Sequence, residues 1–302
     1  MPIKTDEQQT MDKHSSANSL LPRYTLDDLI LPIETLQDIK DFLSYQEHED
    51  LIYNVWGLAK THKHQRQIAI NLYGEPGTGK TIAAQAIASS LNRPIIAINY
   101  SEIESKYVGE TSKNITGIFK QAKDENAVIF FDEADALLSR RVTNMSSSTD
   151  VSVNQTRSVL LTLMDQHIGI IIFTTNFIEN YDAAFMRRIL THILFELPNL
   201  DNRAKLWHKY IPRELPLSWD VSIPKLAEVS KGLSGSDIAN CILKAAMSAS
   251  RKGNKDVDFQ SFINAIDQVN KSKKANRNSD LPYESRLVDE VYINDSLSNN
   301  LV

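Results

Sequence analysis

The sequence contains a single cysteine, Cys241, among 302 residues. One thiol cannot form a disulfide within the chain or build a cysteine cage for zinc, and its place in a helical pattern predicts a small core residue. Long apolar runs are also lacking, because no stretch approaches the roughly 18 residues that a membrane span requires. Residues 1–10 have no apolar segment of the kind found in secretory signals. We therefore expect a soluble, cytoplasmic protein without a membrane partner.

An excess of positive charge is lacking as well. The chain has 33 Lys and Arg against 38 Asp and Glu, which gives a formal net charge of −5. A surface with this balance does not favour a phosphate backbone, so nucleic acid is not the expected partner, although a local basic patch stays compatible with it. Hydrophobic content of 42% and charged content of 24% are ordinary for a soluble globular protein. A chain of this length holds one large or two modest domains.

What the chain does contain is one glycine-rich motif. Residues 74–81 read Gly-Glu-Pro-Gly-Thr-Gly-Lys-Thr and fit the phosphate-binding pattern G-x-x-x-x-G-K-[ST] at every fixed position. The apolar residues 67–73 before it predict a strand, and residues 81–91 after it, rich in Ala and Ile, predict a helix. Glycines let the backbone curl so that N–H groups point at phosphate oxygens, and the helix N-terminus adds partial positive charge.

The side chains of this motif have separate predicted roles. Lys80 would reach the β- and γ-phosphates of a nucleotide, and Thr81 would ligate Mg²⁺. An ordinary glycine turn is the alternative, and the flanking strand and helix count against it. The residues predicted to bind the nucleotide here are Gly74, Glu75, Pro76, Gly77, Thr78, Gly79, Lys80, Thr81 and Ile82.

Further apolar runs predict buried strands at 94–99, 127–133, 169–176 and 191–196. Helical patterns separate the strands, and this alternation predicts a mostly parallel sheet with helices on both faces. In such sheets ligands bind beyond the carboxyl ends of the strands. The phosphate-binding motif and the polar residues that end two of the other strands should therefore meet at one edge.

Those polar residues suit hydrolysis of a γ-phosphate, which requires charge neutralisation and an aligned water. Asp132 ends an apolar strand and would hold Mg²⁺ or its water shell. Glu133 follows it and would orient and polarise the attacking water. Asn176, at the end of the next buried strand, would hydrogen-bond the γ-phosphate or the water. The alternative is that the two acids merely solvate the end of a strand.

The pattern divides the chain into four parts. Residues 1–23 are polar and predict a disordered tail, and residues 24–198 predict the nucleotide-binding α/β domain, with helical patterns before the first strand. From 199 to 270 only helical patterns occur, which predicts a small helical domain. Residues 271–302 are rich in Lys, Asn, Ser and Asp and predict a largely disordered tail.

These motifs resemble the AAA+ ATPases, and more narrowly the AAA family of protein remodellers, over roughly residues 24–269. The resemblance implies an α/β P-loop core with a small all-helical lid, an ATPase activity, and ATP with Mg²⁺ as ligands. Residues 182–188 resemble the segment that carries the arginine finger, with Arg188 as the first choice and Arg187 as the second; a surface basic pair is the alternative. In the family this arginine reaches the γ-phosphate bound by a neighbouring subunit, which implies a homo-oligomeric ring, most often a hexamer.

Other stretches extend the resemblance. The lid helix that approaches the nucleotide would begin at Gly235 and Ser236, and Leu29 and Ile30 would lie near the adenine. Residues 105–110 resemble the first pore loop, and residues 142–151 fall where the family places a second. The substrate-gripping residues would be Lys106, Tyr107 and Val108, because an aromatic face can hold many side chains of a threaded protein. Tyr107 as an anchor of its own loop is the alternative.

The sequence also departs from the family pattern, and other functions share its ATP site. Asp165 is followed by the short connection 166–169, where the family commonly has Asp-Gly and a longer loop. A nucleic-acid loader or motor and a P-loop kinase for a small molecule are the alternative functions. The compact chain also resembles bacterial stand-alone AAA proteins, some of which, of the pachytene-checkpoint type, disassemble HORMA-domain signalling complexes, including in antiphage defence.

Overall fold

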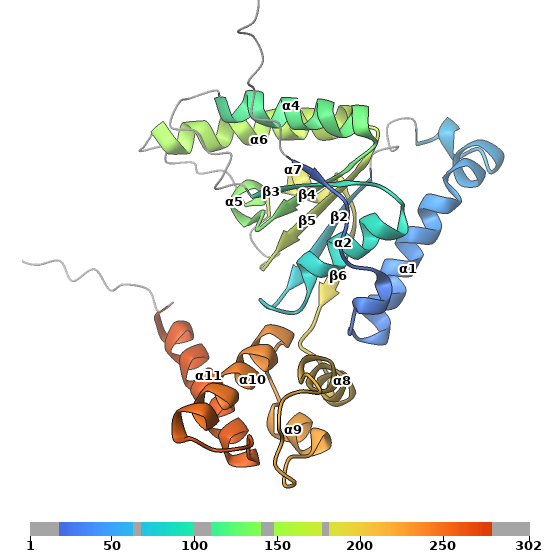
Figure 1. Cartoon of the computed structure of the whole chain (residues 1–302). Helices are drawn as coiled ribbons and strands as arrows, with labels where there is room; N and C mark the ends of the chain where they lie inside the picture. The colour runs from blue at the N-terminus through green and yellow to red at the C-terminus, as the bar shows by residue number, and fades with distance from the viewer. Residues whose placement is uncertain (1–17, 63–67, 100–109, 140–147, 177–180, 280–302) are drawn as a thin grey trace, which may run out of the picture.

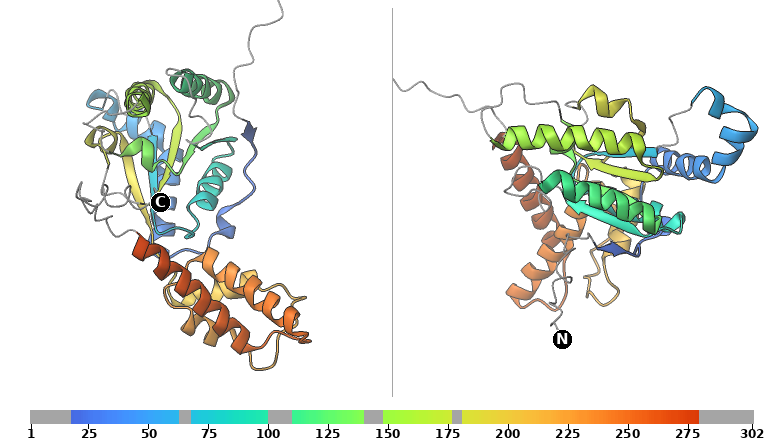
Figure 2. Two further views of the ribbon diagram at one scale, coloured as in Figure 1. Left: turned by 90° about the vertical axis from the view of Figure 1, so that its left-hand side faces the viewer. Right: turned by 90° about the horizontal axis from the view of Figure 1, so that it is seen from above.

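The computed structural model describes residues 18–62, 68–99, 110–139, 148–176 and 181–279 (Figure 1). A sheet sandwiched between helices forms the upper part of the molecule, and the C-terminal helices form a separate group below it. The left-hand view of Figure 2 shows this lower group, the lid, extending away from the sheet. The predicted class, an α/β core with a parallel sheet and a helical lid, is confirmed.

The sheet has six strands in the order β1-β3-β4-β5-β2-β6. All neighbouring pairs are parallel except β1 with β3. The central strands are buried on both faces, which explains their continuous apolar sequences. The strands are β1 (Ser19–Leu20), β2 (Ile68–Gly74), β3 (Ile95–Asn99), β4 (Val128–Asp132), β5 (Ile170–Thr175) and β6 (Ile189–Phe195).

Helices cover both faces of the sheet, and each face has its own hydrophobic core. On one face α4 (Glu110–Glu125) and α6 (Ser148–Gln166) pack side by side, and on the other lie α1 (Ile33–Glu47) and α2 (Lys80–Ser90) (Figures 1 and 2). Two short helices, α5 (Asp135–Leu138) and α7 (Ala183–Met186), follow strands at the edge of this layer. The two cores hold the strands rigidly and so fix the positions of the residues that follow them.

The segment before β2, where the sequence has a helical pattern, does not form one continuous helix. It forms a π-helical turn η2 (Leu51–Val55) and a 3₁₀ turn η3 (Leu58–Lys60), while a further 3₁₀ turn, η1 (Leu26–Asp28), precedes α1. Gly57 separates the two turns with a φ of 79°, a left-handed conformation that a continuing helix cannot contain. The glycine therefore ends the helix that the apolar spacing indicated.

The lid consists of α8 (Leu200–Tyr210), α9 (Ile223–Val229), α10 (Gly235–Lys252) and α11 (Phe259–Ser279). A third core, centred on the fully buried Trp207 and including Cys241, joins them, so the prediction of a buried cysteine is confirmed. The N-cap of α8 is Asn199, whose side chain accepts a 2.9 Å hydrogen bond from the backbone amide of Asn202.

The described residues extend into both predicted tails. Strand β1 lies inside the range 1–23. It pairs antiparallel with β3, and Leu20 lies opposite Ile95. At the other end α11 continues past residue 270 to Ser279. The polar composition of 271–279 predicted disorder, but these residues extend a helix that is already packed against α10. The remaining tail predictions, 1–17 and 280–302, lie outside the described residues.

None of the helices in the described ranges combines the length and the apolar composition that crossing a lipid bilayer requires.

A buried histidine lies where α6 ends. His167 is 7% exposed, its ring meets Phe119 edge-on at 5.1 Å, and its Nε2 has no hydrogen-bond partner within the described ranges. A side chain on Gly169 would come within 2.4 Å of that nitrogen, so only glycine fits there. Burial, helped by the charges of Arg93 and Lys123, lowers the pKa of His167 to about 4 from its ordinary 6.5.

This histidine should make the fold acid-sensitive. The unfolded chain binds the proton near pH 6.5 but the folded chain only near 4, so stability is full above 6.5 and falls as the pH drops toward 4. The loss should reach roughly 3 kcal/mol, at about 1.4 kcal/mol for each pKa unit. Urea unfolding at pH 7 and pH 4.5 measures it. His167→Leu should flatten the pH dependence and His208→Leu, at an exposed position, should not; equal slopes in all three proteins would contradict the assignment.

Candidate active site

Three adjacent strands bring the predicted site residues to one edge of the sheet. Strand β5 lies between β4 and β2, and Tyr73 near the end of β2 pairs with Thr175 at the end of β5. Asp132 ends β4, Asn176 follows β5, and the phosphate-binding loop follows β2. Residues of all three strand ends line one pocket, as the parallel topology requires.

The loop after β2 has the backbone curl that the glycine spacing predicts. Gly74, Gly77 and Gly79 have φ angles of 137°, 75° and 103°, which are strained for any residue with a side chain. A side chain on Gly74 would also come within 2.3 Å of the Phe195 carbonyl oxygen. Helix α2 begins directly at Lys80, so its first amides face the loop. This arrangement suits a polyphosphate.

Lys80 lies inside this loop with only 8% of its surface exposed. Its Nζ donates hydrogen bonds to the carbonyl oxygens of Gly74 at 2.7 Å and Glu75 at 3.0 Å, and to Asn176 Oδ1 at 3.1 Å. Burial lowers the pKa of Lys80, and the negative charges of Asp135 and its neighbours act against that shift. These contacts place the ammonium group between the loop and the end of β5.

Two oxygen-bearing side chains meet beside Lys80. Thr81 Oγ1 donates a 3.1 Å hydrogen bond to Asp132 Oδ2, and Thr174 Oγ1 donates to Asp132 Oδ1. A hydroxyl and a carboxylate next to a phosphate loop are the oxygen ligands that Mg²⁺ takes in nucleotide sites. The residues present therefore fit a magnesium ion, with Thr81 and Asp132 as the side chains that would hold it.

Glu133 has a strained backbone. Its φ is 52°, the left-handed region that a residue with a side chain seldom adopts. Its amide donates 3.2 Å hydrogen bonds to Asp132 Oδ1 and to Thr174 Oγ1, and these bonds stabilise the turn. Because of this turn, Glu133 does not continue strand β4. It is exposed and lines the pocket. An observed outlier of this kind is typical of functional positions.

Asn176 is held from two sides. Its side-chain Oδ1 accepts the hydrogen bond from Lys80, and its backbone amide donates a 3.2 Å hydrogen bond to Asp135 Oδ1. Asp135 and Thr174 therefore position the site although the motifs did not single them out. The signal for Thr174 was present, because it belongs to the polar end of an otherwise apolar strand.

The second half of the pocket lies between the α/β core and the lid. Leu29, Ile30, Ile82, Gly235 and Ser236, all predicted from the sequence, line it together with Gly77 and Gly79. The lid and the connection to it contribute further walls that the sequence reasoning missed, because no motif marks them. These are Glu196, Pro198, Leu206, Lys209 and Tyr210.

Comparison with known protein families agrees with this geometry. The family described as "ATPase family associated with various cellular activities (AAA)" matches residues 70–197, and the "AAA+ lid domain" matches residues 220–264. This protein belongs to the AAA family of ATPases. AAA ATPases as a family hydrolyse ATP, and they generally bind that nucleotide with Mg²⁺.

Curated relatives of this AAA ATPase match over much of its length. It is 31% identical over 254 residues to the ATP-dependent zinc metalloprotease FtsH of Parabacteroides distasonis, which covers 82% of this chain and 36% of the relative. It is 36% identical over 206 residues to the proteasome-activating nucleotidase 1 of Haloferax volcanii, covering 66% and 50%. The nucleotidase of Methanopyrus kandleri is 34% identical over 205 residues, covering 66% and 47%. The chain thus spans about a third to a half of the length of these relatives.

The lid of this AAA ATPase touches the phosphate-binding loop directly. The Ser236 amide donates a 3.2 Å hydrogen bond to the Gly77 carbonyl oxygen. A side chain on Gly77 would come within 2.7 Å of Ser234 Oγ and 2.9 Å of Ser236 Oγ, so the contact tolerates glycine alone. Further out, Lys209 Nζ on α8 donates a 2.8 Å bond to the carbonyl oxygen of Asp28. The lid therefore contacts the core on two sides of the pocket, through a backbone hydrogen bond at Gly77 and through the Lys209 side chain at Asp28.

The two predicted finger arginines lie after α7, away from this pocket. Arg187 is the exposed C-cap of that helix. Arg188 forms a bidentate ion pair with Asp165 at the end of α6, with Nε at 2.6 Å from Oδ1 and Nη2 at 2.7 Å from Oδ2. The hydrogen bond from Arg188 lowers the pKa of Asp165. Asp165, noted in the sequence only for its unusual context, is thus the partner of Arg188.

The sheet separates Arg188 from the phosphate loop of its own chain. Ile189, the next residue, pairs with Ala69 near the start of β2, whereas Phe195 pairs with Gly74 at the end of β2. A strand of 7 residues spans roughly 20 Å at about 3.3 Å per residue. Arg188 therefore lies at the amino edge of the sheet, and the nucleotide pocket lies at the carboxyl edge.

The predicted pore loops do not belong to the described structure. Lys106, Tyr107 and Val108 lie outside the described residues, as does most of 142–151. Only the end of that second range is described, where α6 begins at Ser148.

Proposed function

We propose that this AAA ATPase assembles into a ring, most simply a hexamer, and uses ATP hydrolysis to unfold or dismantle a protein partner. The observation that carries the proposal is the position of Arg188. A cation at the amino edge of the sheet cannot reach its own nucleotide, but it can complete the site of a neighbouring copy in a head-to-tail ring.

Within one subunit we assign the hydrolytic roles to the residues that converge at the carboxyl edge. Lys80 binds the β- and γ-phosphates, and Asn176, already bonded to Lys80, holds the γ-phosphate or the attacking water. Glu133, turned out of β4 by its left-handed backbone, accepts the proton of that water. Thr81 and Asp132 would hold Mg²⁺, which when bound neutralises charge on the phosphate oxygens.

Within a single subunit, the ion pair with Asp165 holds the Arg188 side chain in one orientation. The bidentate geometry orients the guanidinium, and the carboxylate keeps it paired at the surface. We propose that a nucleotide in the neighbouring copy competes with Asp165 for Arg188. The adjacent Arg187, which is exposed, remains the second candidate.

The nature of the partner rests on the relatives and on the pore-loop residues. The relatives are named a proteasome-activating nucleotidase and an ATP-dependent metalloprotease, both of which act on proteins by name. Lys106, Tyr107 and Val108 supply an aromatic and aliphatic pair that would hold an extended chain regardless of its sequence. These points favour a polypeptide as the substrate.

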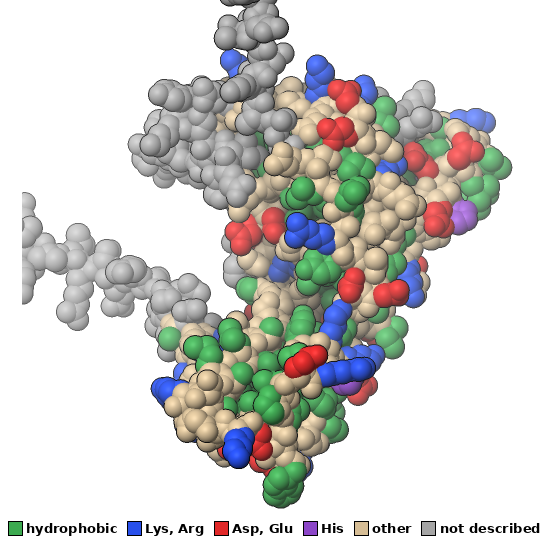
Figure 3. Space-filling model, viewed as in Figure 1, with side chains coloured by type: hydrophobic (Ala, Val, Ile, Leu, Met, Phe, Trp, Pro, Cys, Tyr) green, Lys and Arg blue, Asp and Glu red, His purple; other side chains and the backbone are tan. Residues whose placement is uncertain are grey.

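The other candidate functions receive less support. Acidic and basic side chains are interspersed over the described part of the face in Figure 3, and the net charge is −5, so a nucleic-acid loader or motor is not favoured. A small-molecule kinase that works as a single subunit does not require an arginine from a neighbouring copy, so the position of Arg188 does not favour this function. A HORMA-domain client in antiphage defence stays a prediction that neither the fold nor the relatives bear on.

A substrate trap tests the proposal. Glu133→Gln should hold ATP without hydrolysing it, so a ring carrying this substitution and an affinity tag should retain its client in a pulldown from source cells. We expect one or a few proteins that appear with ATP and not with ADP. The matched control adds Tyr107→Ala to the same chain and should lower recovery by roughly tenfold, since a lost aromatic anchor costs about 1–3 kcal/mol.

The outcomes of the trap separate the candidate functions. Equal recovery with and without Tyr107 would contradict the pore-loop role. Recovery of nucleic acid, removed by nuclease and by moderate salt, would favour the loader or motor instead.

A further inference from the structure

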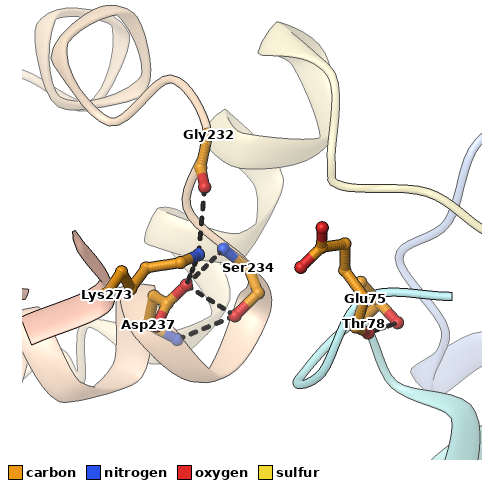
Figure 4. A network of polar contacts seen from close by, with 6 residues as sticks. All are labelled: Glu75, Thr78, Gly232, Ser234, Asp237 and Lys273. Carbon is orange, nitrogen blue, oxygen red and sulfur yellow. Dashed lines mark hydrogen bonds and ion pairs between the residues drawn. The ribbon is translucent and has the colours of Figure 1, made fainter. Parts of the chain in front are cut away.

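The first turn of α10 is bound by a lysine from the far end of the lid. Lys273 on α11 donates a 2.8 Å hydrogen bond to Asp237 Oδ2 and a 3.2 Å bond to the Gly232 carbonyl oxygen (Figure 4). The same Asp237 oxygen accepts 2.8 Å bonds from the amide and from the hydroxyl of Ser234. One ammonium thus ties the loop before α10 to its first turn.

This network is enclosed and charged. The side chains of Lys273 and Asp237 are 29% and 18% exposed, and Asp237 closes the capping box of α10 with Ser234. Burial alone would raise the pKa of Asp237, but the hydrogen bonds from Lys273 and Ser234 outweigh it and lower the pKa. The carboxylate therefore stays ionised and paired, and a charge-assisted bond of this kind is stronger than a neutral one.

The turn that Lys273 binds is the turn that meets the nucleotide loop. Between Ser234 and Asp237 lies Ser236, whose amide donates to the Gly77 carbonyl oxygen and which lines both halves of the pocket. Figure 4 shows this turn facing the loop that carries Glu75 and Thr78. The close packing around Gly77 leaves little space for the turn to shift.

We propose that Lys273 is a positioning residue for ATP binding, because it fixes the start of α10 against the phosphate-binding loop. Without Lys273 the capping box keeps Ser234 and Asp237 together, but the loop at Gly232 is no longer tied to it. The first turn of α10 then samples positions in which the Ser236 amide leaves Gly77, and the pocket between core and lid opens. This inference requires neither a ring nor a client, so it goes beyond the function proposed above.

The experiment compares substitutions along one helix. Lys273→Met removes the ammonium and keeps most of the side chain, Lys273→Arg keeps the charge, and Lys274→Met makes the same change at an exposed neighbour. Equilibrium binding of a fluorescent ATP analogue should weaken roughly tenfold in Lys273→Met, the scale of a lost hydrogen bond to a charged group. Lys273→Arg should recover part of the affinity, and Lys274→Met should match the wild type.

A second readout follows the turn itself in the nucleotide-free chain. Amide hydrogen exchange at residues 234–238 should be faster in Lys273→Met than in Lys274→Met. Asp237→Asn, which keeps the cap acceptor and removes the charge, provides an independent variant and should also weaken the binding of the analogue.

The inference is overturned if both Lys273→Met and Asp237→Asn fold and bind the analogue within twofold of the wild type. It is also overturned if neither folds by circular dichroism, because the network then serves lid stability alone. A wild-type chain that fails to bind the analogue would refute the ATP site itself, which is a different result.

Discussion

Glu133→Gln should leave ATP bound and reduce its turnover by at least a hundredfold. The amide has nearly the shape of the carboxylate, so the left-handed turn at residue 133 and the bonds to its backbone amide should persist. An amide cannot accept the proton of the attacking water, and loss of a general base commonly costs about 10²–10⁴ in rate. Steady-state phosphate release and equilibrium ATP binding, measured on the same preparation, provide the comparison.

Two further variants show whether the loss is specific to the chemical step. Lys80→Met removes the buried ammonium that bonds to the loop and to Asn176, so it should abolish binding as well as turnover. Glu75→Gln changes an exposed acid of the same loop and should affect turnover far less than Glu133→Gln. Normal turnover by Glu133→Gln would refute the assignment of the base.

Arg188→Ala should reduce the ATPase rate of the assembled ring by about 10³ or more, the range found when an arginine finger is lost. The sheet places Arg188 at the amino edge, so the loss should appear in the site of the neighbouring copy. Mixing tests this directly. Arg188→Ala subunits have an intact Glu133, and Glu133→Gln subunits have an intact Arg188, so a mixed ring contains complete sites that neither parent has.

We therefore expect the mixture of these two inactive proteins to recover a measurable part of the wild-type rate. Absence of recovery, with mixed assembly verified by two different tags, would exclude action across the interface. Asp165→Asn is the control for the ion pair: if Arg188 served only to pair with Asp165, this variant would reproduce the loss. Because it frees the guanidinium, we expect it to keep the activity. The same mixing with Arg187→Ala decides between the two arginines.

The sequence was sufficient for the features that local rules determine. The φ angles of Gly74, Gly77 and Gly79 follow from the need of a phosphate loop for left-handed backbone, and the apolar runs follow from strands buried on both faces. Parallel topology then brings Asp132 and Asn176 to one edge without further information. The convergence of these residues therefore follows from the order of residues along the chain.

Contacts between distant residues were not predictable in this way. Arg188 and Asp165 lie on separate elements, and nothing in either local sequence indicates that they pair. Lys273 lies in a polar stretch whose composition is typical of disorder, yet it belongs to a helix because α11 continues along α10. In both cases tertiary packing overrode the local pattern, and a charged side chain found a partner that only the fold supplies.

The placement of a cation and a nucleotide pocket at opposite edges of one sheet has a consequence for partial assemblies. If each copy completes only the next, a linear row always has one terminal pocket without its cation and one terminal cation without a pocket. Only closure of the row matches every donor with an acceptor, so the last copy to join completes two junctions, whereas each copy added to the open row before it completes one. The ATPase rate per subunit is then highest in a closed ring and lower in an open row, without any separate inhibitor.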